Sequence, residues 1–178
     1  SVHTDFTPGP IVATDNPLDL AINGPGFFMV EGPNGPMYTR SGTFQPNRLG
    51  QVVTPEGFAL LDAQGRQITL PPDAVDVSVL DDGSVNADGL TVGRVAVAQF
   101  DDPSQLSRIG TSVFQPTAGV EPNLIPADIR SGYREMSNAS HISEMVQLIS
   151  GYRHFEAAQR ALRALDESIA SRTSPRSG

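Results

Sequence analysis

Residues 140–171 form a long stretch that contains no proline and one glycine, and most of its residues favour an α-helix. Apolar side chains recur along it at steps of three and four residues, which is the spacing of one face of a helix. The predicted subunit-interface positions on this face are Ile142, Met145, Leu148, Ile149, Tyr152, Phe155, Leu162, Leu165 and Ile169. At 1.5 Å per residue the helix would be about 48 Å long, whereas a compact domain of this chain would have a radius of gyration of about 16 Å. The helix therefore spans the molecule or projects from it, and its apolar face needs a partner.

The partner of this apolar face can be read in two ways. The face could pack on the rest of the chain as ordinary core. Its length, and the three successive steps of three residues from Ile149 to Ala158, favour a contact with other helices whose register changes midway. Gly151 lies inside the predicted helix, where it costs about 1 kcal/mol relative to alanine. It is either a tolerated defect or a point of close approach or bending.

The residues before the predicted helix carry turn signals instead of helical spacing. Glycine (17 residues) and proline (15 residues) are abundant, and turns such as Asn34-Gly35 separate short apolar runs. Val92–Phe100 is the longest predicted strand, and Asp101–Gly110 is predicted to be a loop with one helical turn. The predicted fold is mainly β. A small, twisted, Gly/Pro-rich domain of short hairpins at residues 1–136 is followed by one long C-terminal amphipathic α-helix at 137–173 and a disordered tail at 174–178.

Charge and composition exclude several classes of function. The formal net charge is −8 and the chain contains no lysine, which argues against nucleic acid and anionic membranes as partners. The absence of cysteine excludes disulfides and thiolate chemistry. No apolar run reaches the ~18 residues of a membrane span, and no cleaved signal peptide is expected.

The motifs that could carry chemistry each have a simpler explanation. Gly24-Pro25-Gly26 resembles the start of a dinucleotide loop, but a turn between two strands is the better interpretation. The segment Asp81–Asp88 places oxygen-bearing side chains at alternate positions, as a calcium loop does, but it lacks the central glycine and the distal glutamate. His141 and His154 would lie about 20 Å apart along one helix and cannot share a metal. We therefore expect no enzymatic activity, no cofactor and no metal.

Three ordered motifs carry a resemblance to a known family. The run Thr14–Phe28 resembles the T-x-N-P-L-D-x-A-I-x-G-x-G-F-F signature of flagellar basal-body rod and hook proteins. A second set is similar to that family's Y-T-R-x-G-x-F-x-x-N-x-x-G-x-L-V motif and consists of Tyr38, Thr39, Arg40, Gly42, Phe44, Asn47, Gly50 and Val52. A third set resembles its C-terminal motif and consists of Ser137, Asn138, Glu144, Met145, Val146, Arg153, Phe155 and Glu156.

The sequence departs from the family pattern in two respects. Tyr152, Phe155 and Ala158 stand where glutamine, tyrosine and asparagine are usual, which puts polar contacts between helices in doubt. The N-terminal helix with its N-L-A-N run, which pairs with the C-terminal helix in the family, is absent. The resemblance therefore implies a truncated chain whose long helix lacks its partner.

The resemblance implies a structural subunit of the rod, most similar to the proximal-rod members. Such a subunit would polymerise with other rod and hook subunits and with itself, and would transmit torque from motor to hook. It would reside in the periplasmic basal body after export by the flagellar type III apparatus, without insertion into the membrane.

Two alternatives remain open. One is a distal-rod or hook subunit of the same family. The other is a secreted ligand-binding or carbohydrate-binding β domain, although the chain has no tryptophan and only 3 tyrosines for stacking on sugars.

Overall fold

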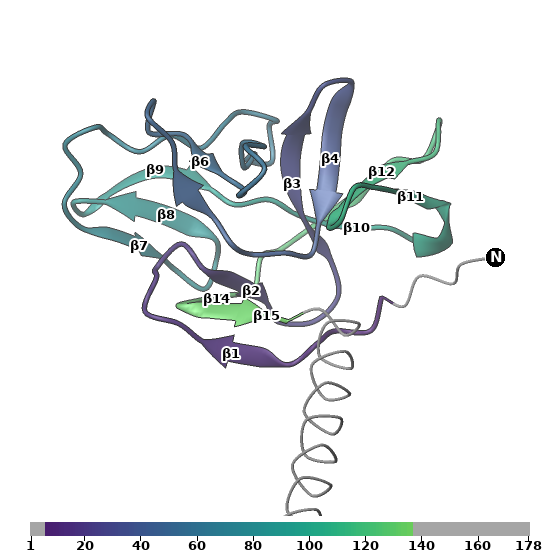
Figure 1. Ribbon diagram of the computed structural model, residues 1–178, viewed down its shortest axis with the longest axis horizontal. Coiled ribbons are helices and arrows are strands. Elements are labelled where there is room, and N and C mark those ends of the chain that lie inside the picture. The colour runs from purple at the N-terminus through teal and green to yellow at the C-terminus, as the bar shows by residue number, and fades with distance from the viewer. Residues whose placement is uncertain (1–5, 137–178) are drawn as a thin grey trace, which may run out of the picture. The chain divides into compact units, whose positions relative to one another are not determined.

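The computed structural model describes residues 6–136 (Figure 1). They belong to one of two compact units of the chain, the one that comprises Ser1–Asn138. This part forms fifteen β-strands and one short 3-10 helix, which confirms a mainly β chain built from short hairpins. The predicted helix at 137–173 and the predicted tail at 174–178 lie outside the described residues.

A six-stranded antiparallel sheet is the largest element of the fold. Its strands lie in the order β11 (Leu106–Ile109), β12 (Val113–Pro116), β4 (Gly35–Thr39), β3 (Phe27–Gly32), β10 (Val97–Gln99) and β13 (Asn123–Ile125). A three-stranded sheet has the order β7 (Val77–Val79), β8 (Ser84–Ala87) and β9 (Leu90–Arg94). The remaining strands form three antiparallel pairs, namely β5 (Gln45–Pro46) with β6 (Val52–Val53), β2 (Leu20–Ile22) with β14 (Ile129–Ser131), and β1 (Ile11–Ala13) with β15 (Tyr133–Glu135).

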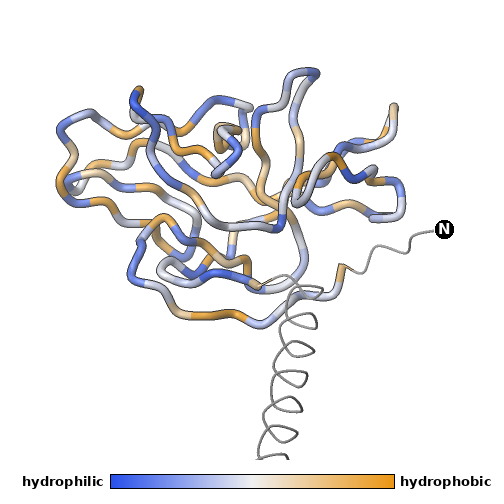
Figure 2. Tube along the Cα trace, viewed as in Figure 1, coloured by the Kyte–Doolittle hydropathy of each residue, from blue (hydrophilic) through white to orange (hydrophobic). Residues whose placement is uncertain are grey.

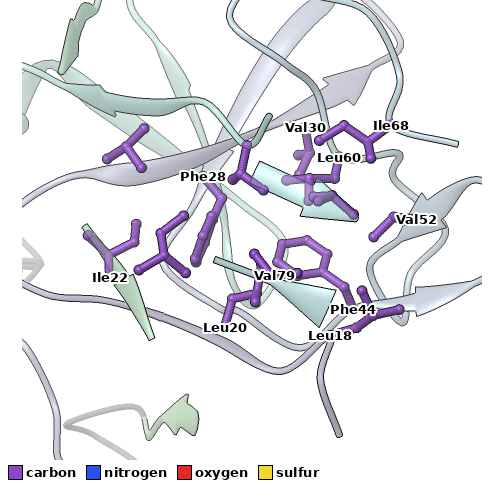
Figure 3. Close-up of a cluster of buried hydrophobic side chains, with 14 of the residues drawn as sticks. Leu18, Leu20, Ile22, Phe28, Val30, Phe44, Val52, Leu60, Ile68 and Val79 are labelled. Atoms are coloured by element: carbon purple, nitrogen blue, oxygen red, sulfur yellow. The ribbon is translucent and has the colours of Figure 1, made fainter. Parts of the chain in front are cut away.

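Strand β3 is buried on both faces, which explains its uninterrupted apolar sequence. Phe28 and Val30 point into the larger core cluster, where Phe28 packs edge-on against Phe44 with ring centroids 5.3 Å apart (Figure 3). Phe27 and Met29 belong to a second cluster on the opposite face. Successive side chains of a strand alternate between its two faces. A strand that lies between two apolar cores therefore needs apolar residues at successive positions.

The second cluster is mainly aromatic. Phe27 makes edge-to-face contacts with Phe100 and Phe114, at centroid distances of 6.1 and 5.9 Å. Tyr38 lies 4.8 Å from Phe100, also edge to face. Such contacts join β3, β4 and β12 across the same face of the sheet and add to the stabilisation that burial supplies.

Two glycines of the family-like motifs are required by close packing. A Cβ on Gly42 would collide with the backbone carbonyl of Leu20. Gly26 has φ +127°, and a Cβ there would lie 2.7 Å from Cγ1 of Val97. Both positions therefore exclude any larger residue, and Gly26 also needs the left-handed backbone that favours glycine.

The structure corrects the prediction of one long strand at Val92–Phe100. The chain instead leaves β9 at Arg94 and enters β10 at Val97, so the run serves two sheets (Figure 1). The β10 half is buried and the β9 half only partly so, and the sequence of such a run does not show where a strand changes sheets. The polar stretches and the apolar runs along the chain are visible as the alternating colours of Figure 2.

The structure corrects two further predictions made from the sequence. The predicted loop Asp101–Gly110 contains the expected helical turn, η1 (Pro103–Gln105), but also the edge strand β11. Val75, Val77 and Val79 alternate with polar residues, a pattern that predicts one strand with a buried face. Val75 instead lies before β7, which has only three residues, and is 92% exposed.

Candidate assembly site

The chain enters and leaves the β body through one two-stranded ribbon. In this ribbon β1 pairs antiparallel with β15, and Val12 faces Arg134. The Met136 amide donates to the carbonyl of Pro10 at 2.8 Å, and the Thr14 amide donates to Gly132 at 2.7 Å. Strands β1 and β15, near the two ends of the described residues, are therefore held side by side (Figure 1).

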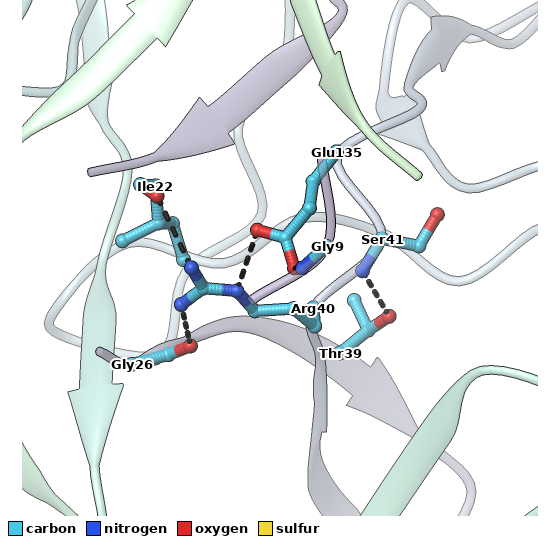
Figure 4. A network of polar contacts seen from close by, with 7 residues as sticks. All are labelled: Gly9, Ile22, Gly26, Thr39, Arg40, Ser41 and Glu135. Atoms are coloured by element: carbon cyan, nitrogen blue, oxygen red, sulfur yellow. Dashed lines mark hydrogen bonds and ion pairs between the residues drawn. The ribbon is translucent and has the colours of Figure 1, made fainter. Parts of the chain in front are cut away.

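Arg40 fastens this ribbon to the body (Figure 4). Its Nε donates to Oε2 of Glu135 at 2.8 Å, and its Nη1 and Nη2 donate to the carbonyls of Gly26 at 2.7 Å and Ile22 at 3.1 Å. The second carboxylate oxygen of Glu135 accepts from the amide of Gly9 at 3.2 Å. One guanidinium thus joins the end of β4, the loop between β2 and β3, and the last strand, and we call this network the Arg40 clamp.

The Arg40 clamp is largely withdrawn from solvent. The side chains of Arg40 and Glu135 are 19% and 7% exposed. A charge in such a place depends on its partners, because removal of one partner leaves the other buried and unpaired. The planar guanidinium suits this role because its fixed fork of donors reaches several acceptors at once.

A second polar network underlies the Thr14–Phe28 motif. The buried carboxylate of Asp19 accepts from Thr14 Oγ1 at 2.7 Å and from Asn16 Nδ2 at 3.2 Å. The Asn16 side chain also accepts from the amide of Leu18 at 3.1 Å. The carbonyl of Asp19 accepts from the amides of Gly132 and Tyr133, at the junction of β14 and β15. These motif residues therefore shape the turn that carries β14 and β15.

The sequence motifs identified Arg40 and Asp19 but not their partners in the last strand. Glu135 is 95 residues from Arg40, and no local pattern marks it as the counter-ion. The sequence predicts one strand at Ile129–Glu135, and the structure corrects this prediction. Gly132, with φ +78°, divides the segment into β14, which pairs with β2, and β15, which pairs with β1. The one signal of this break in the sequence is the glycine itself, inside a mostly polar segment.

The predicted interface positions lie outside the described residues, so the structure does not place them. They are Ile142, Met145, Leu148, Ile149, Tyr152, Phe155, Leu162, Leu165 and Ile169. The assignment of this face to subunit packing stays a prediction.

The carboxylates of the Asp81–Asp88 hairpin take part in turn structure. Asp82 accepts from the amide of Ser84 at 2.9 Å and pairs with Arg94 at 3.2 Å. The hydrogen bonds from the backbone and side chain of Ser84 lower the pKa of Asp82, with a smaller effect of Arg94. Within residues 6–136, no group of three or more His, Asp or Glu side chains is placed to hold a metal ion.

A depression of the described surface has a volume of about 520 Å³ and lies between the β3–β4 hairpin and the segment 115–124. Its lining is mostly proline, glycine and aliphatic residues, with Tyr38 and Glu121 as the titratable groups. Burial raises the pKa of Tyr38, so its phenol keeps its proton at neutral pH. Among residues 6–136, no helix has the length and apolar character needed to cross a membrane.

Comparisons with known families and proteins agree with the motifs. Residues 21–87 match the family described as the flagellar hook protein FlgE/F/G D1 domain. Residues 130–173 match the flagellar basal body rod FlgEFG protein C-terminal family. The second match starts in β14 and includes β15, whereas β1 lies before the first match.

Individual relatives cover most of the chain. The flagellar basal-body rod protein FlgF of Caulobacter vibrioides is 36% identical over 162 residues, which is 90% of this chain and 66% of the relative. FlgF of Rhizobium meliloti is 32% identical over 90% of this chain and 68% of its own length. FlgG of Buchnera aphidicola subsp. Schizaphis graminum is 31% identical over 95% of this chain and 69% of its own length.

The chain thus spans about two thirds of the length of these relatives. Their names agree with the expected resemblance to the proximal-rod protein FlgF, with FlgG close behind. Two family matches in the expected order, together with relatives above 30% identity across nearly the whole chain, identify this chain as a FlgF-like member of the flagellar basal-body rod protein family.

Proposed function

We propose that this chain is a structural subunit of the proximal rod in the flagellar basal body, where it assembles with other rod and hook subunits and with copies of itself. The observation that carries the proposal is the 36% sequence identity with FlgF of Caulobacter vibrioides over 90% of the chain. FlgG relatives at 31–32% identity are the second candidate, a distal-rod role. The subunit acts mechanically and not as an enzyme, and it resides in the periplasm after export without a cleaved signal.

The Arg40 clamp suits a subunit that bears load. Torque passes between subunits only if each body is rigidly joined to the segments through which it is held. The clamp fixes both strands of the ribbon to the body. Glu135 of β15 binds Arg40, and it also accepts from the amide of Gly9, which precedes β1. The clamp resists rotation of the ribbon against the body, because such a rotation breaks several charge-assisted hydrogen bonds at once.

The apolar face of the predicted helix provides the second part of the mechanism. Its packing against helices of neighbouring subunits buries large aliphatic and aromatic side chains, each of which contributes about 1.5–3 kcal/mol. Such packing supports axial assembly. The motif departures at Tyr152, Phe155 and Ala158 make these contacts more apolar than in the family pattern.

The proposal is tested by locating the protein in the source bacterium. An epitope-tagged copy replaces the native gene, and isolated hook–basal bodies are examined by immunoblot and immunogold electron microscopy. We expect label on the rod near its membrane end and loss of motility when the gene is deleted. Label on the distal rod supports the second candidate, and absence from basal bodies overturns the proposal.

A further inference from the structure

The chain contains two Asn-Gly pairs, and each lies in a turn of the β body. Asn23-Gly24 follows β2, and Asn34-Gly35 lies in the β3–β4 hairpin. Asparagine is a thermolabile residue, and it is most reactive before glycine, because glycine has no Cβ to hinder an approach of its backbone nitrogen. In this reaction the glycine nitrogen bonds to Cγ of the asparagine, the Cγ–Nδ2 bond breaks, and ammonia leaves with the proton of the glycine amide. Water then opens the cyclic imide and gives aspartate or isoaspartate.

Ring closure needs a free asparagine side chain and a free glycine amide, and Asn34 has only the first. Asn34 is exposed, and its side chain has no hydrogen-bond partner among the described residues. Gly35, however, begins β4 and pairs with Gly32 of β3. The amide of Glu31 points away from β4 and donates to the carbonyl of Ala59 at 2.8 Å. Because pairs in an antiparallel ladder alternate, the next pair, Gly32 with Gly35, is the one that exchanges hydrogen bonds, which engages the Gly35 amide.

The loop after β2 has the reverse arrangement. Gly24 lies outside the strands, and its amide donates to no described residue. Its φ is +96°, and a Cβ at this position would meet nothing within 4 Å. The side chain of Asn23 is held instead, since its Nδ2 donates to Oδ2 of Asp128 at 2.8 Å. The amide of Asn23 also donates to the carbonyl of Asp128 at 2.8 Å, and we call these two bonds the Asn23–Asp128 tether.

We propose that Asn23 is a deamidation site whose reaction with Gly24 is restrained by Asp128. The backbone bond of the tether fixes Asp128 beside Asn23, so the carboxylate is preorganised to hold the side-chain amide. Cγ of Asn23 reaches the Gly24 nitrogen only after the bond between Nδ2 and Oδ2 has broken. Asp128 is therefore a positioning residue and takes no part in the bonds that form and break. The reaction needs only water as a co-reactant, and the inference does not depend on the proposed function.

The products of this reaction would disturb the Arg40 clamp. Ile22 and Gly26, on either side of the reactive pair, supply the two carbonyls that accept from Arg40 (Figure 4). Isoaspartate lengthens the main chain between these carbonyls by a methylene group. Aspartate places a second carboxylate beside that of Asp128, where an amide had donated a hydrogen bond, and like charges repel. We therefore expect a modified chain to be less stable than the unmodified one.

The first experiment incubates the full chain at neutral pH and follows each asparagine by mass spectrometry. Cleavage after arginine releases residues 1–40 as one peptide, because Arg40 is the first arginine of the chain. Fragmentation of this peptide reports Asn23 and Asn34 in the same sample. We expect Asp128→Ala to deamidate at Asn23 about fivefold faster than the wild type, because one hydrogen bond no longer opposes ring closure.

Two further variants test whether the tether is the cause. Asp128→Asn keeps an acceptor oxygen at this position and should protect Asn23 nearly as well as the wild type does. Asp101→Ala is the matched control, because Oδ1 of Asp101 accepts from Nδ2 of Asn123 at 2.9 Å in the same manner. Leucine follows Asn123, and its side chain hinders ring closure, so loss of this hydrogen bond should leave Asn123 unmodified.

Asn34 serves as the internal reference for unfolding, because an unfolded chain exposes both Asn-Gly pairs equally. Its rate should be the same in Asp128→Ala and in the wild type. The proposal is overturned if Asn23 reacts no faster in Asp128→Ala than in the wild type. It also fails if Asn34 accelerates by the same factor as Asn23, since a general loosening of the fold would then explain the result.

A second experiment measures the effect of the product on stability. Asn23→Asp should unfold at a lower urea concentration than Asn23→Gln, which keeps an amide at this position. Asn23→Asp combined with Asp128→Asn should regain most of the difference, because only one of the two side chains then carries a charge. Equal urea midpoints for Asn23→Asp and Asn23→Gln would contradict the expected effect of the product.

Discussion

A single guanidinium, that of Arg40, ties together segments that lie far apart in the sequence. Its acceptors are the carboxylate of Glu135 and the carbonyls of Ile22 and Gly26. Arg40 is part of the family-like motif, but only the structure explains why this position holds an arginine. Lysine offers one charged point and cannot reach acceptors in three directions with a fixed geometry.

Replacement of Arg40 by methionine should lower the free energy of unfolding by about 3 kcal/mol, because Glu135 and two carbonyls lose their buried donor. Arg40→Lys should recover part of the loss. Urea unfolding of the full chain at pH 7 measures both changes, with Arg108→Met on exposed β11 as the control. Equal stability of Arg40→Met and the wild type would show that the clamp contributes nothing to the fold.

A pH effect is expected at Asp62, which is buried and bridged to Arg66 at 2.9 Å. Burial by itself raises the pKa of this carboxyl, but hydrogen bonds from the amides of Arg66 and Gln64 and the charge of Arg66 outweigh it and lower the pKa below the ordinary value. Because the pKa of Asp62 is lower in the folded state, its charged form stabilises the protein at pH values above the unfolded pKa. This stabilisation is lost as the pH falls through the folded pKa.

Asp62→Asn should therefore destabilise the chain by about 1 kcal/mol at pH 7. The difference from the wild type should shrink as the pH falls below about 4, the unperturbed value for aspartate. Urea midpoints at pH 7, 5 and 3 measure this difference. A gap that stays constant over this range would contradict the role of the charged form.

At the scale of elements, local signals predicted the hairpins and missed the long-range pairs. Asn34-Gly35 marks the β3–β4 turn, and β3 and β4 appear where their apolar runs predict them. Strand β1 has only three residues, and its partner β15 lies more than a hundred residues later, so no turn signal joins them. The same reason hid Glu135 as the counter-ion of Arg40, since a sequence pattern reports neighbours and not distant contacts.

The two-sided burial of β3 gives a test at this scale. Phe27→Ala and Phe28→Ala should each cost about 3–5 kcal/mol, although the two side chains point in opposite directions, because each face meets its own core. Leu124→Ala on the edge strand β13 is 49% exposed and should cost far less. Thermal and urea unfolding provide the values. If one of the phenylalanine variants behaved like Leu124→Ala, that face of β3 would not be core.

At the scale of the whole molecule, the ribbon brings the two ends of the body together, and the family match places rod-type sequence on both sides of that joint. For the predicted helix face, which lies outside the described residues, we propose packing between subunits. Phe155→Asp combined with Leu162→Asp should abolish incorporation into basal bodies and motility. The same change should leave the unfolding temperature of the β body nearly unchanged. A large fall in that temperature would mean that the face is core of the body.

The central claim is that this chain is a rod subunit whose β1–β15 ribbon is fixed to the β body by the Arg40 clamp. Electron cryo-microscopy of hook–basal bodies from the source bacterium tests it most directly. We predict density for the body of residues 6–136 in the proximal rod, with Arg40 and Glu135 in contact where the chain turns toward the rod axis. Rod density that excludes this body, or a ribbon that is unpaired in the assembled rod, would contradict the account.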